Sequence, residues 1–429
     1  MSKTITLTLS TRLSNRTSKE LLDYLRDFRT FYGHIFRTVW KYVNKTKCVF
    51  NISSYNTHLQ HTFGILKRIA NSIIKDAIGK YKAIAQRRLY DKQRLSYKLD
   101  FIRQRIIFYN KILIDKQLKE KVTNNTATGK ELQRYRNIKH KLYYLRQTMN
   151  HINNQLANIQ KEIDAKQYKY CFGTQQLYRL QSHDKKFYAH FQQQRNANIL
   201  YIGAKNETNC NQMLQLTKIG NVYHIQLRTH DKTRKYVNGY CSFKYMEHIL
   251  ANELINKSHG ISYRFHFNGN KCYLQAILTL PFAKYITTGD NGYIGIDFNT
   301  NCIAITETNK DGNIMHTNMF QYTNATLNHA LQHITNYAIT KKKNIAIEQL
   351  RFCKQKSNTA SNTFLKHFAY AKYTRRMRLL CATKGIQLSE ITPAYTTQIA
   401  KTKYCYQRKL TAHQGAAYVI ARLAQNLQP

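Results

Sequence analysis

The chain has 429 residues, and its 68 Lys and Arg against 22 Asp and Glu give a formal net charge of +46. Hydrophobic residues make up 42% of the chain, which excludes wholesale disorder. We expect no transmembrane helix, because the sequence has no run of about 18 uncharged apolar residues. We also expect no signal peptide, because the N-terminal residues lack that pattern.

So large a positive charge indicates a polyanionic partner, because self-repulsion disfavours a compact chain unless something neutralises it. Nucleic acid is the leading candidate, and the 32 Tyr and 19 Phe provide flat rings on which bases can stack. The alternative is a basic protein from a proteome rich in Lys, Asn and Tyr.

The N-terminal part is predicted to be helical after one short strand. Alternation over residues 3–9 predicts the strand, and Ser18 is a candidate N-cap for an amphipathic helix that ends near residue 45. A second helical stretch is expected over about 57–90.

Apolar residues then recur at heptad spacing on both sides of a break at residues 124–129. The first seam is Leu95, Leu99, Ile102, Ile106, Tyr109 and Leu113, and the second is Ile138, Leu142, Leu145, Met149, Ile152, Leu156 and Ile159. They predict an antiparallel helical hairpin over residues 91–162. Its outer face, rich in Lys, Arg and Gln, is either a solvated surface or a basic arm that lies along a nucleic-acid backbone.

Two kinds of β structure are expected after the helices. Residues 166–285 contain short strands with hairpin signals near 218–221 and 268–270, which predict an antiparallel β-barrel or sandwich that the N-terminal strand could join. From about residue 291, the order becomes strands, helix, strand, helix, strand and helix. That is the element order of an RNase H-like α/β fold.

Two acidic residues interrupt apolar strands of this last region. Asp297 lies midway along Tyr-Ile-Gly-Ile-Asp-Phe-Asn, and Glu348 ends Asn-Ile-Ala-Ile-Glu. A buried carboxylate is costly unless it is paired or bound to a metal. For either acid alone, pairing with a nearby Lys or Arg is the simpler explanation. The pair on strands of one sheet favours a site for two Mg²⁺ ions, which prefer oxygen ligands.

A third ligand is expected at the start of the last helix, beside the first strand of this region. No Asp or Glu occurs after Glu390, and His413 occupies the expected place. A neutral imidazole can ligate a metal or move a proton, although a capping or packing histidine is an equal alternative. Glu390, on the strand expected at 386–392, is a second candidate to complete the site.

Other kinds of site have little support. The nine cysteines are scattered, and no two have C-x-x-C spacing, so we expect reduced thiols and no zinc. The phosphate loop of ATPases, the G-x-S-x-G elbow and the H-E-x-x-H motif do not occur.

Four segments resemble the successive RuvC motifs of TnpB-type proteins, the transposon-encoded, RNA-guided nucleases related to type V CRISPR effectors. The segments are Gly295–Asn299, Ala346–Leu350, Thr392–Gln398 and His413–Arg422, within residues 291–425. Upstream, residues 171–174, 194–198 and 211–216 resemble the β-rich wedge region of one TnpB branch. The resemblance covers roughly the last 260 residues.

The resemblance implies a multidomain α+β protein. Residues 289–429 would form the RuvC-like RNase H-fold nuclease domain. Residues 1–14 with 166–288 would form an antiparallel β-barrel wedge domain, and residues 15–165 the helical recognition lobe inserted into it.

The same resemblance implies a guide RNA, a double-stranded DNA target, and Mg²⁺-dependent cutting with Asp297, Glu348 and His413. Guided proteins of this kind read sequence by base pairing and hold nucleic-acid backbones through positive charge. In a prokaryote we would expect the protein in the cytoplasm, associated with the nucleoid.

Two features depart from the family pattern. Many TnpB proteins carry a four-Cys zinc ribbon where residues 399–410 hold only Cys405, and His413 stands at the position of the usual final acid. The sequence therefore leaves three hypotheses. They are an active RNA-guided DNA endonuclease, a nuclease-impaired and repressor-like DNA-binding protein, and an RNA-binding protein that retains an RNase H-like fold. A strand-transfer transposase is disfavoured, because the resemblance is to the guide-dependent group.

Overall fold

A computed structural model describes residues 4–114, 116–233, 235–299, 301–323, 325–349, 360–392 and 395–428, with the backbone alone for residues 114, 116–118, 208 and 360–371. The chain divides into two compact units, here called the N-terminal unit (Leu9–Ile277) and the C-terminal unit (Met1–Thr8 with Leu278–Pro429). The predicted three-part organisation stays a prediction. None of the helices in the described ranges has the length and apolar character of a membrane-spanning segment.

Strand β1 (Thr4–Arg12) precedes the helices of the N-terminal unit. These are α1 (Lys19–Lys45), α2 (Ile52–Phe63), α3 (Lys67–Ile114), α4 (Lys116–Thr123), α5 (Gly129–Ala165), α6 (Gln175–Leu180) and α7 (Lys185–Arg195). The helix predicted over 57–90 is wrong in its extent, because Gly64 ends α2 in the left-handed region (φ 64°). Glycine adopts this conformation without a Cβ penalty. The second part of the stretch belongs to the longer helix α3.

Ser18 precedes α1 as predicted, but its side chain does not cap the helix. Its Oγ donates a hydrogen bond to the carbonyl oxygen of Tyr240 at 3.0 Å and accepts one from the backbone nitrogen of Tyr240 at 2.9 Å. The hydroxyl therefore fixes the start of α1 to a distant strand.

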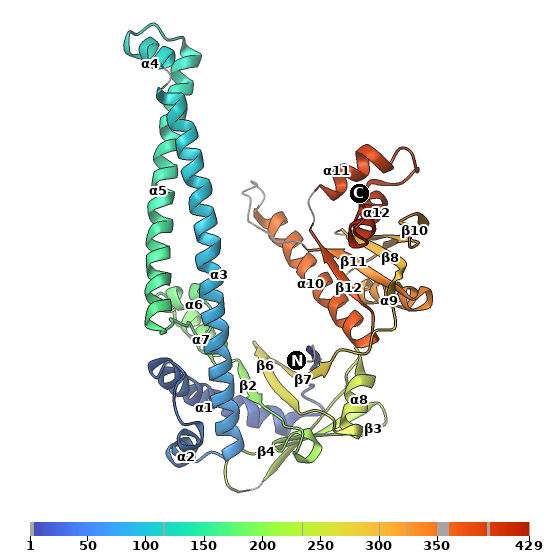
Figure 1. Ribbon diagram of the computed structural model, residues 1–429. Helices are drawn as coiled ribbons and strands as arrows, with labels where there is room; N and C mark the ends of the chain where they lie inside the picture. The colour runs from blue at the N-terminus through green and yellow to red at the C-terminus, as the bar shows by residue number, and fades with distance from the viewer. Residues whose placement is uncertain are drawn as a thin grey trace. The chain divides into compact units, whose positions relative to one another are not determined.

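Helices α3 and α5 lie side by side (Figure 1). Residues from both predicted seams pack between them: Leu95, Leu99, Ile102 and Ile152 are buried, and Ile106, Leu145, Met149, Leu156 and Ile159 pack against them. Thr128 and Glu131 form a capping box at the start of α5, which satisfies backbone N–H groups that the first turn leaves without partners.

The β structure of residues 198–281 forms two sheets. Its elements are β2 (Asn198–Tyr201), η1 (Thr208–Cys210), β3 (Leu214–Ile219), β4 (Val222–Arg228), β5 (Tyr236–Cys241), α8 (Glu247–Asn256), β6 (Ile261–Asn268) and β7 (Lys271–Pro281). One sheet has the order β1-β7-β6-β2, and the other has the order β3-β4-β5. The N-terminal strand joins the first sheet, but the predicted closed barrel is not confirmed among the described strands.

The C-terminal unit has one five-stranded sheet with the order β10-β9-β8-β11-β12. Its elements are β8 (Thr288–Phe298), β9 (Cys302–Thr308), β10 (Ile314–Gln321), α9 (Leu327–Lys341), β11 (Lys343–Glu348), α10 (Ala360–Lys384), β12 (Leu388–Ile391), α11 (Thr396–Ile399), η2 (Ala400–Tyr404) and α12 (Ala412–Ala424). β8, β9 and β10 pair antiparallel, whereas β11 pairs parallel with both β8 and β12. The protein is thus a mixed α+β, multidomain chain. The predicted element order is present in this unit, and its assignment as a RuvC-like fold stays a prediction.

Candidate active site

Asp297 lies near the end of β8, on the face of the sheet that α12 covers. Gly295 shares this face, because alternate residues of a strand point to the same side. A Cβ at Gly295 would lie only 2.0 Å from the carbonyl oxygen of Ala417 in α12. Glycine therefore allows α12 to lie directly against β8, and this places the first turn of α12 beside Asp297.

His413 lies in that first turn, which a capping box of Thr411 and Gln414 stabilises. His413 Nδ1 lies 3.0 Å from Asp297 Oδ2, and Asn299 Nδ2 lies 3.0 Å from each of these two atoms. The side chain of His413 is 46% exposed, against 14% for Asp297. The histidine thus faces solvent on one side and the partly buried carboxylate on the other.

One tautomer of His413 satisfies the hydrogen-bond partners of Asp297 best. The carboxylate of Asp297 and the amide nitrogen of Asn299 are respectively an acceptor and a donor. Nδ1 cannot accept from Asn299 and donate to Asp297 at the same time. The arrangement that satisfies the carboxylate has Nδ1–H and the Asn299 amide both donating to Oδ2. In the neutral imidazole, Nε2 is then the unprotonated ring nitrogen.

Glu348 ends β11 on the strand next to Asp297. The parallel register pairs Ala346 with Gly295 and Ile347 with Ile296, and one further residue brings Glu348 level with Asp297. Glu348 is 9% exposed, and Thr396 Oγ1 donates a hydrogen bond to its Oε1. Burial raises the pKa of Glu348, and the charge of Asp297 raises it further, although the Thr396 hydrogen bond partly opposes both.

No Lys or Arg pairs with Asp297 or Glu348 among the described residues. Elsewhere in the same sheet, Glu307 of β9 is buried beside Lys343, whose Nζ lies 2.6 Å from Glu307 Oε1, and accepts a hydrogen bond from Tyr337. Burial raises the pKa of Glu307, but the hydrogen bonds from Lys343 and Tyr337 bring it below its ordinary value. The sheet therefore neutralises one buried acid internally and leaves the Asp297–Glu348 pair without such a cation.

Glu390 is not brought together with the other candidate residues. In β12 it pairs in register with Ile347, and its neighbour Ile391 is the residue level with Glu348. Its side chain therefore points to the opposite face of the sheet from Glu348. There Arg378 of α10 binds both carboxylate oxygens, with Nη2 at 2.7 Å from Oε2, and the pKa of Arg378 is raised by this contact.

Two residues of the site had no role assigned from the sequence. Asn299 lies immediately beyond β8 and bonds Asp297, and Thr396 follows β12 and bonds Glu348. Both fall within the segments that resemble RuvC motifs. Asn299 is a polar side chain directly after a strand, and Thr396 is the first residue of α11, but sequence alone does not identify which carboxylate each one contacts.

Within the described ranges, no group of three or more His, Cys, Asp or Glu is arranged to hold a metal ion. The site does offer carboxylate oxygens from Asp297 and Glu348, and no described residue bonds Asp297 Oδ1. Oxygen donors of this kind suit Mg²⁺ better than softer metals. The residues present therefore fit a cation held by two carboxylates, and the role of His413 as a ligand stays a prediction.

No protein-family model and no curated protein matches the chain. Among solved structures, the Cas12i1 R-loop complex before target DNA cleavage matches with a TM-score of 0.21 and 10% identity over 82% of this chain and 45% of the other. The same complex after target DNA cleavage matches with a TM-score of 0.20 and 9% identity over 89% of this chain and 51% of the other. This chain thus spans about half the length of those chains.

Proposed function

We propose that this protein is an RNA-guided DNA endonuclease that hydrolyses phosphodiester bonds at the site formed by Asp297 and Glu348. The observation that carries the proposal is this pair of largely buried carboxylates on adjacent parallel strands, with no Lys or Arg partner among the described residues. In a chain with a net charge of +46, such a local excess of negative charge indicates a place for an external cation. The TnpB-like motifs around both acids point to the same chemistry.

Asp297 and Glu348 would hold Mg²⁺, and two ions are expected. When bound, Mg²⁺ supplies an activated water and stabilises the leaving oxygen of the phosphodiester. His413 and Asn299 would orient Asp297 by donating to Oδ2, so that Oδ1 points away from both donors. Thr396 would hold Glu348 in the same way through Oε1. The exposed side chain of His413 would accept a proton near the reacting groups through Nε2.

The second candidate function is guided DNA binding without cutting. The contact that favours it is the 3.0 Å hydrogen bond between His413 Nδ1 and Asp297 Oδ2, because a third acid would offer oxygen ligands where the imidazole offers a donor. A site with only two carboxylates would bind cations more weakly. The protein would then occupy its DNA target, as a repressor does.

The test is plasmid cleavage by the purified protein together with the RNA that copurifies with it. The target matches that RNA and is flanked by randomised sequence, and the reaction contains either Mg²⁺ or EDTA. We expect Mg²⁺-dependent linearisation that Asp297→Ala abolishes. Glu390→Gln is the matched control, because Glu390 is also a strand carboxylate but lies on the opposite face with Arg378.

Three outcomes are informative. Cleavage lost in Asp297→Ala and retained in Glu390→Gln supports the nuclease, and the His413→Ala variant then reports whether the imidazole is required. Tight, guide-dependent binding of the target without cleavage supports the repressor-like function. Absence of copurifying RNA would refute the guide, and cleavage that Asp297→Ala leaves intact would refute the site.

A further inference from the structure

Four aromatic side chains form a stripe along one face of α3. Tyr90, Tyr97, Phe101 and Phe108 are between 59% and 63% exposed. Tyr97, Phe101 and Phe108 lie 7, 11 and 18 residues after Tyr90. With 3.6 residues per turn, all three spacings return to the same side of a helix. The buried seam residues Leu95 and Leu99 lie on the other side of α3. The rings of Tyr90, Tyr97 and Phe101 therefore face away from the buried seam between α3 and α5.

The stripe is flanked by cationic and amide side chains. The pattern Gln-Arg-x-x-aromatic occurs three times in α3, beginning at residues 86, 93 and 104, so that each repeat places an arginine next to the stripe. The guanidinium of Arg105 lies 5.8 Å from the ring centre of Phe101, and Gln93 Nε2 donates to the hydroxyl of Tyr97 at 3.2 Å. Residues 86–162 hold 18 Lys and Arg against six Asp and Glu. The surface is thus aromatic and carries a net positive charge, with Arg87 and Arg94 also paired to Asp91.

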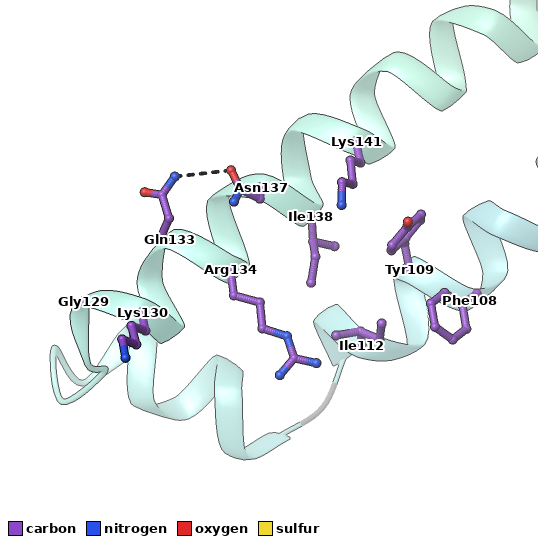
Figure 2. A pocket seen from close by; sticks show the side chains of 10 residues that line it. All are labelled: Phe108, Tyr109, Ile112, Gly129, Lys130, Gln133, Arg134, Asn137, Ile138 and Lys141. Carbon is purple, nitrogen blue, oxygen red and sulfur yellow. Dashed lines mark hydrogen bonds between the residues drawn. The ribbon is translucent and has the colours of Figure 1, made fainter. Parts of the chain in front are cut away.

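The stripe ends at a pocket between α3 and α5 (Figure 2). Phe108, Tyr109 and Ile112 line it from α3, and Lys130, Arg134 and Lys141 contribute three positive charges from α5. Its volume is about 650 Å³, and none of the described residues that line it is acidic. Arg105 donates a hydrogen bond to the hydroxyl of Tyr109 and thereby lowers the pKa of that group. The pocket combines ring faces with cations, as sites for a base and its phosphate do.

We propose that this face of the helical hairpin binds unpaired bases of a structured RNA, with the bases stacked on the stripe and the phosphates held by the flanking arginines. Charge complementarity selects a polyanion and disfavours a second copy of this equally basic hairpin. The spacing favours protruding bases over a continuous strand. Tyr90 and Tyr97 are about 10 Å apart along the helix axis, as are Phe101 and Phe108, and only Tyr97 and Phe101 are as close as about 6 Å.

Such separated rings suit bases displayed from loops and bulges, which is how most sequence-specific RNA recognition works. Gln side chains next to the stacked bases can also bond the 2′-hydroxyl groups that distinguish RNA from DNA. The inference concerns α3 and α5 alone. It is independent of the proposed nuclease activity, because it is tested by binding in the absence of any divalent cation.

The experiment measures binding of the full-length protein by fluorescence anisotropy at two salt concentrations. The probes are a stem-loop RNA, an RNA duplex with the same stem and no loop, and single-stranded DNA with the loop sequence. One variant replaces Tyr90, Tyr97, Phe101 and Phe108 by leucine, which keeps apolar area and favours the helix. The matched control is Tyr90→Phe/Tyr97→Phe, which keeps every ring. Circular dichroism verifies that both variants retain the helical content.

The leucine variant should bind the stem-loop RNA at least about fivefold more weakly for each base that loses its stacking partner. Its salt dependence should not change, because the phosphate contacts remain. The phenylalanine control should bind the stem-loop RNA with wild-type affinity. All three proteins should bind the loop-free duplex with the same affinity. Wild-type affinity of the leucine variant for the stem-loop, or an equal loss on the duplex, would overturn the proposal. A larger loss on single-stranded DNA than on RNA would show that the occupant is DNA and would also overturn it.

Discussion

Replacing Gly295 by alanine tests whether α12 lies as close to β8 as the structure indicates. The added Cβ would lie 2.0 Å from Ala417 O, 2.7 Å from Ala421 N and 3.0 Å from Ala421 Cβ. Two of these atoms belong to the backbone and cannot rotate away, so α12 would have to move by about 1 Å. Overpacking of this kind costs about 1 to 3 kcal/mol, and a rigid neighbour favours the upper end. For a unit of this size, a cost of about 3 kcal/mol lowers Tm by roughly 6 to 12 °C.

The assay combines thermal unfolding with hydrogen exchange of peptides from β8 and α12. Gly295→Ala should lower Tm and speed exchange in α12, while exchange in α3 stays unchanged. Gly79→Ala is the matched control, because Gly79 lies inside α3 and a methyl group added there would have no atom within 4 Å. There alanine should stabilise the helix by about 0.5 to 1 kcal/mol. Wild-type Tm and wild-type exchange of α12 in Gly295→Ala would refute the close packing that positions His413.

Two further predictions concern the charges of the same sheet. Lys343→Met leaves Glu307 buried without its cation and should lower the free energy of unfolding, measured by urea denaturation, by about 3 to 5 kcal/mol. The double variant Lys343→Met/Glu307→Met should recover most of this loss. A double variant as unstable as the single one would contradict the energetic coupling between Lys343 and Glu307. The second variant is Glu348→Gln. Because burial, with a further contribution from Asp297, raises the pKa of Glu348 above its ordinary value of 4.5, the ionised form destabilises the fold at neutral pH. Glu348→Gln should therefore be more stable than the wild type at neutral pH, and the difference should vanish as the pH falls below 4.5, where both folded and unfolded wild type are protonated. Mg²⁺ should raise the Tm of the wild type and not that of Glu348→Gln. If Glu348→Gln were less stable than the wild type at neutral pH, burial would not be destabilising the ionised form of Glu348.

Local patterns predicted those parts of the structure that depend on local spacing. The seam of Leu95 and Leu99 repeats at helical period, and these residues pack against Ile152 across the hairpin. Helix ends were harder to predict, because the effect of a glycine depends on its surroundings. Gly64 adopts a positive φ and ends α2, whereas Gly79 lies inside α3. Closure of the predicted barrel depends on pairing between distant strands, which hairpin signals do not report.

The candidate site could be predicted as far as the acids themselves. Asp297 and Glu348 were identifiable because a carboxylate inside an apolar strand is costly without compensation. What compensates each acid depends on strand register, which the sequence does not specify. Glu390 was a reasonable third candidate by position, but the register turns it to the face where Arg378 binds it. Asn299 was part of a recognised segment, yet its hydrogen bond to Asp297 required the fold.

Some acids of this sheet are paired with a lysine or arginine and others are not. This difference is the strongest physical reason to expect an external cation at Asp297 and Glu348. The chain has 68 basic residues, so a lysine or arginine could readily have been placed beside any acid. Lys343 does this for Glu307, and Arg378 does it for Glu390. At Asp297 and Glu348 the described partners are instead a histidine, an amide and a hydroxyl, which orient carboxylates without a permanent positive charge. A buried and a partly buried carboxylate arranged in this way gain the most from a divalent cation, because its binding offsets both the repulsion between them and the cost of burying Glu348.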